Sequence, residues 1–199
     1  GSYDGPIVVM VSGDDDATYY DEASATDIAF GTGKQLRSMV PSGTTETTVS
    51  ILTDIAYQLS IANSTVLTDT SVALFNERVR LALAPELTSI ISLPFLFDSS
   101  TTAADLADNL AGRYALRLAA LAQLGASGAT PALSIAEQLA QDFADGERDG
   151  LSGSTAITGL LYNTGTLAAD LSSHLASFAK AYGSSSLQTA ISAYSGISL

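Results

Sequence analysis

Acidic side chains alternate with other residues in one short stretch of the C-terminal half of the chain. Asp145, Glu147 and Asp149 stand at the first, third and fifth positions of a stretch whose sixth residue is Gly150. Hard cations such as Ca²⁺ bind about six to eight oxygen atoms, and alternating carboxylates before a turn-forming glycine supply the first of them. The carbonyl of Leu151, at the seventh position, would add another. The pattern predicts a calcium site at Asp145, Glu147, Asp149 and Leu151.

Two features of the same stretch weaken the calcium interpretation. The twelfth position is Ala156, where a bidentate Glu is expected, and Glu147 is longer than the usual Asp or Asn. Asp142, one helical turn earlier, is a candidate substitute ligand. The alternative is a helix end with a left-handed glycine, followed by an acidic and solvated turn. Such turns are common, which favours the alternative and leaves calcium open.

A second acidic cluster lies near the N-terminus, where Asp14, Asp15 and Asp16 are adjacent and Asp21 and Glu22 follow closely. Adjacent like charges repel one another, and a bound cation would relieve that repulsion. Water relieves it equally well at an exposed hairpin tip. We therefore expect a solvated tip.

The residues needed for catalysis are sparse. His174 is the only histidine, so zinc sites with two or more imidazoles are excluded. Ser172, Ser173 and Asp170 are close in sequence, but adjacent residues on a helix do not face each other. No Gly-x-Ser-x-Gly nucleophile elbow is present. We predict no catalytic residue and no organic cofactor.

Composition limits the partners of this 199-residue chain, which carries 21 acidic and 8 basic residues for a formal net charge of −13. That charge repels phosphate backbones and anionic lipid surfaces, so we expect no nucleic-acid partner. The absence of cysteine excludes disulfides and thiolate metal sites. No apolar run approaches the roughly 20 residues that span a bilayer, so the sequence predicts no transmembrane segment.

The first part of the chain has the pattern of short strands. Residues 7–11 are a β-branched run, and residues 18–20 and 35–40 are further β-prone segments between Gly, Asp and Ser clusters. We expect a β-rich region over residues 1–46, either as a small hairpin or sheet or as the end of an upstream β domain. Isolated hairpins are marginal in water, so these strands must pack on something.

From residue 47 to residue 199 the apolar spacing changes to that of helices. Apolar side chains recur at three-and-four intervals, which places them on one face of each helix. The clearest stripes are Leu52, Ile55, Ala56 and Leu59; Val72, Phe75, Val79 and Leu83; Leu106, Leu110, Tyr114, Leu118 and Leu121; Ile135, Leu139 and Phe143; and Leu167, Leu171 and Leu175. The sequence predicts a mainly α fold, an Ala-rich bundle of six to seven helices.

Two boundaries within this helical part have their own signals. Thr102 and Asp105 have the spacing of a capping box, which predicts the start of the longest helix. Residues 85–98 are too apolar for an exposed loop and are interrupted by Pro94. We interpret that segment as a buried connector.

Several segments resemble those of bacterial surface lipoproteins and adhesin-like exported proteins, in which the end of an immunoglobulin-like or carboxypeptidase-regulatory-like β region leads into an Ala-rich helical domain. They are Gly5-Pro6-Ile7-Val8-Val9, Tyr20-Asp21-Glu22-Ala23, Leu36-Arg37-Ser38-Met39-Val40-Pro41, Val49-Ser50-Ile51-Leu52-Thr53-Asp54-Ile55-Ala56, and Phe143-Ala144-Asp145-Gly146 with Asp149-Gly150. The segment 50–53 departs from the Thr-Pro-Leu-Thr helix start that is more usual there. The resemblance implies an extracytoplasmic, non-catalytic module.

Two functions remain open from the sequence. The first is an exported module at the cell surface, outside the cell or in the periplasm, which acts as a spacer or binds a protein or glycan and is stabilised by Ca²⁺. The second is a periplasmic or secreted hydrolase or small-ligand-binding protein, with a site between helices near the apolar residues 93–97.

Overall fold

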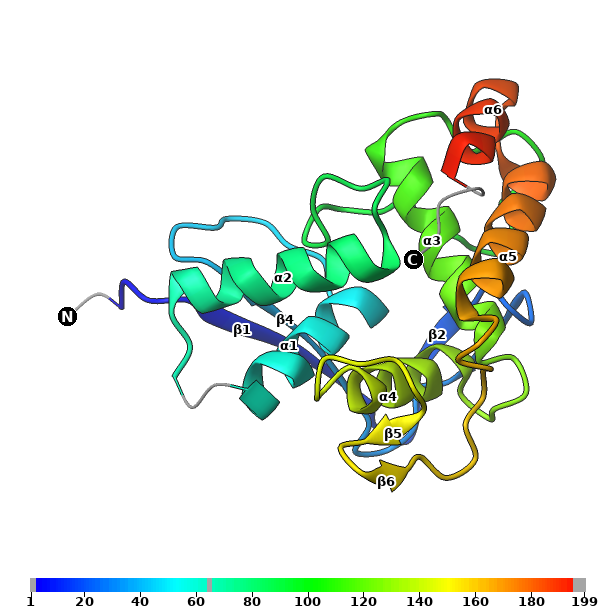
Figure 1. Ribbon diagram of the computed structural model, residues 1–199. Coiled ribbons are helices and arrows are strands. Elements are labelled where there is room, and N and C mark those ends of the chain that lie inside the picture. Colours follow the sequence, from blue (N-terminus) through cyan, green and yellow to red (C-terminus); the bar gives the residue numbers. More distant parts are fainter. Residues whose placement is uncertain (1–2, 64–65, 195–199) are drawn as a thin grey trace.

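The computed structural model describes residues 3–63 and 66–194, which form six helices and three antiparallel strand pairs (Figure 1). The helices are α1 (Ile51–Asn63), α2 (Asp69–Leu83), α3 (Leu110–Leu124), α4 (Pro131–Asp142), α5 (Leu167–Tyr182) and α6 (Ser185–Tyr194). The strands are β1 (Ile7–Ser12), β2 (Thr18–Asp21), β3 (Thr26–Ala29), β4 (Gln35–Val40), β5 (Leu151–Ser152) and β6 (Thr155–Ala156). A mainly helical chain with a small N-terminal β region is confirmed. No described helix is both long and apolar enough to cross a bilayer.

The N-terminal strands pair in two separate units. β1 runs antiparallel to β4, with Ile7 opposite Val40, and β2 runs antiparallel to β3 as a hairpin. β-Branched side chains in β1 and tyrosines in β2 favour the extended backbone. Asp21 closes the turn of the hairpin, because its carboxylate accepts a hydrogen bond from the N–H of Ser24 at 2.8 Å.

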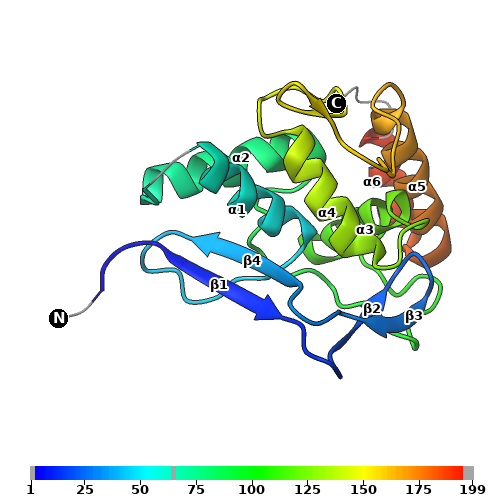
Figure 2. The same ribbon diagram turned by 90° about the horizontal axis from the view of Figure 1, so that it is seen from below.

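The helices cover the two strands of the β1–β4 sheet unequally. β4 packs against α1, and its residues Ser38, Met39 and Val40 are buried. β1 makes its main contacts with β4, and all six of its residues are exposed. Figure 2 shows α1 and α2 on one side of the sheet and β1 at its outer border. The expectation that the strands pack on other elements is therefore correct for β4 but not for β1.

The helical core is built around α1, which packs against both α2 and α4, while α3 packs against α4 and α5. The apolar stripes predicted for α1 and α2 are buried, and so are those of α4 and α5. Pro131 opens α4 as predicted, since a proline at the first helical position loses no intrahelical hydrogen bond. The three-and-four spacing thus identified the core of four helices.

The predicted start of the longest helix at Thr102 is wrong. Asp105 does accept hydrogen bonds from the N–H and hydroxyl of Thr102, but they close an isolated turn. Leu106, which the stripe includes, lies outside the helix and pairs its backbone with the chain around Gly183. The helix begins at Leu110, where the side chain of Asn109 accepts the N–H of Gly112 at 2.9 Å.

The connector between α2 and α3, residues 84–109, contains no helix and is held by side chains of the helices beside it. Arg80 of α2 donates a hydrogen bond to the carbonyl of Leu87 at 2.7 Å. The buried hydroxyl of Tyr114, on α3, donates to the carbonyl of Ile90 at 2.5 Å. These contacts satisfy backbone carbonyls that no helix or strand satisfies.

The prediction that residues 85–98 form a buried connector is correct only for the first part of that segment, where Leu87 and Ile90 are buried. Glu86 is buried and accepts two hydrogen bonds, of 2.6 and 2.8 Å, from the guanidinium of Arg117. Further along, Leu93, Phe95 and Leu96 are exposed, and Leu96 keeps 78% of its surface in solvent. The apolar segment therefore begins in the core and continues onto the surface.

Candidate functional site

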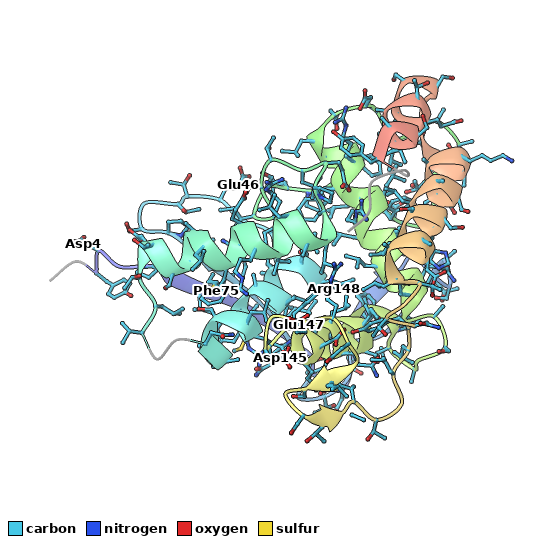
Figure 3. All side chains as sticks on the ribbon, in the orientation of Figure 1. Asp4, Glu46, Phe75, Asp145, Glu147 and Arg148 are labelled. Atoms are coloured by element: carbon cyan, nitrogen blue, oxygen red, sulfur yellow. The ribbon has the colours of Figure 1, made fainter. Side chains whose placement is uncertain are left out.

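The predicted calcium residues lie on the surface loop between α4 and β5. Figure 3 labels Asp145, Glu147 and Arg148 on this loop, and Asp145, Glu147 and Asp149 are all exposed. Asp145 accepts the N–H of Glu147 at 3.0 Å, and Asp149 accepts the N–H of Leu151 at 2.9 Å. Each aspartate therefore stabilises its own turn through one carboxylate oxygen.

The backbone of the loop reverses direction twice and then enters a hairpin. Gly146 has a φ of +97° and Gly150 a φ of +81°, a region that favours glycine. Leu151 and Ala156, the seventh and twelfth positions of the predicted loop, are paired residues of β5 and β6. In the described part of the chain, no three acidic or imidazole side chains are grouped as a metal site. Calcium at Asp145, Glu147, Asp149 and Leu151 remains a prediction.

Asp142, the proposed substitute ligand, is directed into the protein. Its side chain is fully buried; one oxygen accepts the N–H of Gly150 at 2.6 Å and the other accepts the hydroxyl of Tyr162 at 2.6 Å. Burial, together with this hydrogen bond to a carboxylate, raises the pKa of Tyr162. Asp142 therefore anchors the loop.

The other acidic and imidazole candidates are found at separate places. Asp15 accepts a hydrogen bond of 2.6 Å from the hydroxyl of Thr32, in the turns that follow β1 and precede β4, and Asp14 accepts the N–H of Asp16. His174 is half-buried on α5 and makes no hydrogen bond to a serine or aspartate among the described residues.

An apolar pocket of about 300 Å³ is lined by residues 94–97, four of the five residues (93–97) near which the sequence suggested a ligand site. Side chains from the β2–β3 hairpin, the end of β1 and the starts of α1 and α4 enclose it. Its lining comprises Val11, Tyr19, Tyr20, Glu22, Phe30, Leu36, Thr48, Val49, Ser50, Ile51, Pro94, Phe95, Leu96, Phe97, Leu118, Ala132 and Leu133. The pocket is therefore formed between the hairpin and the helices rather than between helices alone.

Two polar groups of the hairpin give this pocket its electrostatic character. Burial raises the pKa of Glu22 from about 4.5 to about 7, and the neighbouring carboxylate of Asp21 adds to the rise. The hydroxyl of Tyr19 is buried beside the backbone of Ala132 and completes no hydrogen bond with a described residue. An apolar wall with a protonatable carboxyl and an unsatisfied hydroxyl suits a ligand that is mostly apolar.

The most unusual surface feature of the protein is the exposed apolar strand β1. Five consecutive apolar side chains there are exposed: Ile7 46%, Val8 38%, Val9 37%, Met10 52% and Val11 45%. β4 is the only strand paired with β1 among the described residues, so the other edge of β1 presents free backbone N–H and C=O groups. Natural proteins usually protect such an edge with charges, prolines or bulges, and β1 carries none of these along Ile7–Ser12.

Sequence reasoning placed this strand correctly and missed its exposure. A continuous apolar run is typical of a strand buried on both faces. Whether such a run is buried depends on what covers it, and the local sequence carries no signal for that. A surface strand usually alternates polar and apolar residues, and β1 does not. This lack of alternation was the only sign in the sequence that the two faces of β1 are unusual.

Comparison of the chain with protein-family models, curated proteins and solved structures finds no match.

Proposed function

We propose that this chain is a non-catalytic protein-binding module of the exported, cell-surface type, and that β1 is its binding strand. The single observation that supports this most strongly is the exposure of five consecutive apolar residues along an edge strand. Exposed apolar patches of this kind mark interaction sites in proteins that remain soluble. Uncharged edge strands bind extended peptide segments by adding a strand to the sheet.

The pocket extends the proposed surface beyond the end of β1. Val11 belongs both to β1 and to the lining of the pocket, next to the exposed residues Phe95 and Leu96. If a partner segment paired with β1, a side chain of that segment beyond the paired residues would reach the pocket. Backbone pairing would supply affinity there, and an apolar or aromatic side chain in the pocket would supply specificity.

The charge of the module restricts its partner. β1 carries no charged residue, whereas the chain as a whole has a net charge of −13. Long-range repulsion disfavours acidic partners and also opposes self-association through β1. The proposed partner therefore presents an extended apolar segment within a neutral or basic surface.

A matched pair of lysine substitutions tests the strand. Short linear peptides are selected for binding from a displayed library, and the affinity of the selected peptides is measured for Met10→Lys and Leu74→Lys. The two positions are 52% and 53% exposed, so each variant adds one charge to an apolar surface site. We expect Met10→Lys to abolish binding and Leu74→Lys to preserve it. Equal effects, or peptides whose binding leaves the NMR signals of β1 unchanged, would contradict the proposal.

The exported location belongs to the same proposal. The acidic composition, the lack of cysteine and the resemblance to exported surface proteins support it. Labelling intact cells of the native organism with a membrane-impermeant amine reagent tests it, because Lys34 and Lys180 are both exposed. Modification of these lysines only after cell lysis would contradict a cell-surface location.

Stabilisation by Ca²⁺ is a further part of this proposal. The alternation of Asp145, Glu147 and Asp149 on an exposed loop with two positive-φ glycines supports it. The carbonyl of Leu151 would complete the protein ligands, and water would supply the rest.

A second candidate function is the binding of a small ligand in the pocket, and the chemistry of Tyr19 and Glu22 favours it. The ligand would be mostly apolar and would carry one hydrogen-bonding group for the unsatisfied Tyr19 hydroxyl. Thermal melts with a panel of aromatic alcohols and amides test this candidate. A melting temperature that rises with an alcohol in the native chain but not in Leu133→Trp, which fills the pocket, would support it. An equal rise in both would contradict it.

A further inference from the structure

More than half of the cations of this acidic chain have a carboxylate partner. Five of the eight basic residues form ion pairs: Lys34 with Glu137, Arg37 with Asp54, Arg80 with Glu77, Arg113 with Asp108 and Arg117 with Glu86. Within the described ranges Arg78, Arg148 and Lys180 have no ion pair. Because the chain has 21 acidic residues, the lack of a carboxylate partner for two arginines needs a structural explanation.

Two of these three cations line the same pocket. Arg78 comes from α2 and Arg148 from the loop after α4, and both line a pocket of about 370 Å³ to which α1 contributes Leu59. Figure 3 shows Arg148 beside Glu147 and Asp145 on this loop, with Phe75 on the neighbouring helix α2. Two arginines from segments distant in sequence therefore line one pocket.

The position of Arg78 follows from the helix. Its guanidinium lies over the ring of Phe75, 5.7 Å from the ring centroid, in the geometry of a cation–π contact. Its Nη2 atom lies 3.9 Å from the place that a Cβ of Gly146 would occupy. The guanidinium of Arg78 therefore lies close to the backbone of the loop at Gly146, whose φ of +97° favours glycine.

The position of Arg148 follows from the anchored loop. The side chain of Asn63, at the end of α1, donates to the carbonyl of Ala144 at 3.2 Å, and Asp142 binds the N–H of Gly150. These bonds hold both ends of the turn that carries Arg148. The adjacent Asp149 accepts the N–H of Leu151 with one carboxylate oxygen and forms no ion pair with Arg148 among the described residues.

The rest of the pocket wall is apolar. Leu59, Val79 and Phe143 are buried at its base, and Leu81 keeps 55% of its surface exposed at its border. Such a wall excludes water from one side of the guanidinium groups and strengthens their attraction for an anion. It also offers contact to an apolar body attached to that anion.

We propose that Arg78 and Arg148 form a binding site for the carboxylate of a small organic acid with an apolar body. Guanidinium groups bind carboxylates through paired N–H···O hydrogen bonds. The exposed Asp145, Glu147 and Asp149 around the loop repel anions of higher charge, so a single negative charge fits better than a phosphate dianion. No residue of this pocket belongs to β1 or to residues 94–97, so the site is independent of the proposed partner surface.

Titration calorimetry with phenylacetate as the probe, at low ionic strength and with EDTA present, tests the site. We expect Arg78→Gln and Arg148→Gln each to weaken binding by about tenfold or more, because each removes charge-assisted hydrogen bonds. Lys180→Gln is the matched control, since it removes an unpaired exposed cation elsewhere and is expected to bind as the native chain does. Equal melting temperatures of the variants show that the losses are local.

Two comparisons define the ligand class. Phenylacetamide, which has the same body without the charge, is expected to bind at least about tenfold more weakly than phenylacetate. Inorganic phosphate is expected to bind more weakly as well. The proposal is overturned if phenylacetate does not bind, if both arginine variants bind it as the native chain does, or if phosphate or the amide binds as tightly.

Discussion

The hydroxyl of Tyr162 donates a hydrogen bond of 2.6 Å to the fully buried carboxylate of Asp142, twenty residues earlier in the chain. The second oxygen of the same carboxylate holds the N–H of Gly150. One buried anion thus fixes the end of α4, the acidic loop and the segment after the β5–β6 hairpin relative to one another. These two hydrogen bonds anchor the loop that carries Arg148 and the predicted calcium residues.

Removing that hydroxyl should destabilise the protein. Tyr162→Phe takes one of two hydrogen bonds from a buried carboxylate, so we expect the free energy of unfolding to fall by about 1.5–3 kcal/mol. Urea denaturation measures the change. Tyr57→Phe is the control, because the hydroxyl of Tyr57 has no hydrogen bond to a described residue and its loss should change stability by less than about 0.5 kcal/mol. Equal effects of the two substitutions would show that Asp142 does not need this donor.

Glu22 makes stability depend on pH near neutrality. Its pKa is raised by burial to about 7, so the folded protein binds more protons than the unfolded chain between pH 4.5 and 7. Stability from this group is therefore complete below about pH 4.5 and is lost as the pH rises through 7. We expect Glu22→Gln to be more stable than the native chain at pH 8, by no more than about 3 kcal/mol, and to have no advantage at pH 4.5.

Thermal melts at both pH values test the Glu22 prediction. Glu46→Gln serves as the control, because Glu46 is exposed and its neutralisation should change the melting temperature little at either pH. An advantage of Glu22→Gln that is the same at pH 4.5 and pH 8 would show that titration of Glu22 is not its source.

The buried pair of Arg117 and Glu86 should be strongly sensitive to single substitutions. Both side chains are at most 6% exposed, and removing one partner leaves the other as an uncompensated buried charge. We expect Arg117→Met or Glu86→Leu alone to lower the free energy of unfolding by about 3–5 kcal/mol. The double variant should lose much less than the sum. Strict additivity in a double-mutant cycle would contradict a direct interaction between the two side chains.

Calcium should raise the melting temperature if the acidic loop binds it. A ligand that binds only the folded state stabilises it by mass action, so millimolar Ca²⁺ should give a higher melting temperature than EDTA. Asp149→Asn should abolish the difference, whereas Asp15→Asn, in the other acidic cluster, should leave it intact. An unchanged melting temperature in EDTA removes calcium from the proposed function.

The helices could be predicted where a single apolar face meets the core. The stripe of Val72, Phe75 and Val79 is buried as its spacing indicates, and Pro131 begins a helix as its fixed φ favours. Such features are local, since three-and-four spacing and helix caps depend on residues within one or two turns. Three of the N-terminal strands, β1, β2 and β4, were recognised for the same reason, whereas β3 was not.

The connector and the sites depend on contacts that are distant in sequence. The hydrogen bond from Tyr114 to Ile90 spans 24 residues, and Tyr114 alone reads as an ordinary apolar-stripe residue. Likewise, nothing near Arg78 predicts that Arg148 will lie in the same pocket. The exposure of Leu96 was missed because an apolar segment favours burial, but its own sequence does not show whether another element of the fold covers it.

The backbone bridge at Leu106 affects how the protein unfolds. The N–H of this buried residue bonds to the carbonyl of Tyr182, and its carbonyl accepts the N–H of Ser184. Undocking α5 and α6 would leave both groups without partners inside the protein. The C-terminal helices are thus tied to the connector, and the chain should melt in one cooperative transition rather than shed them first.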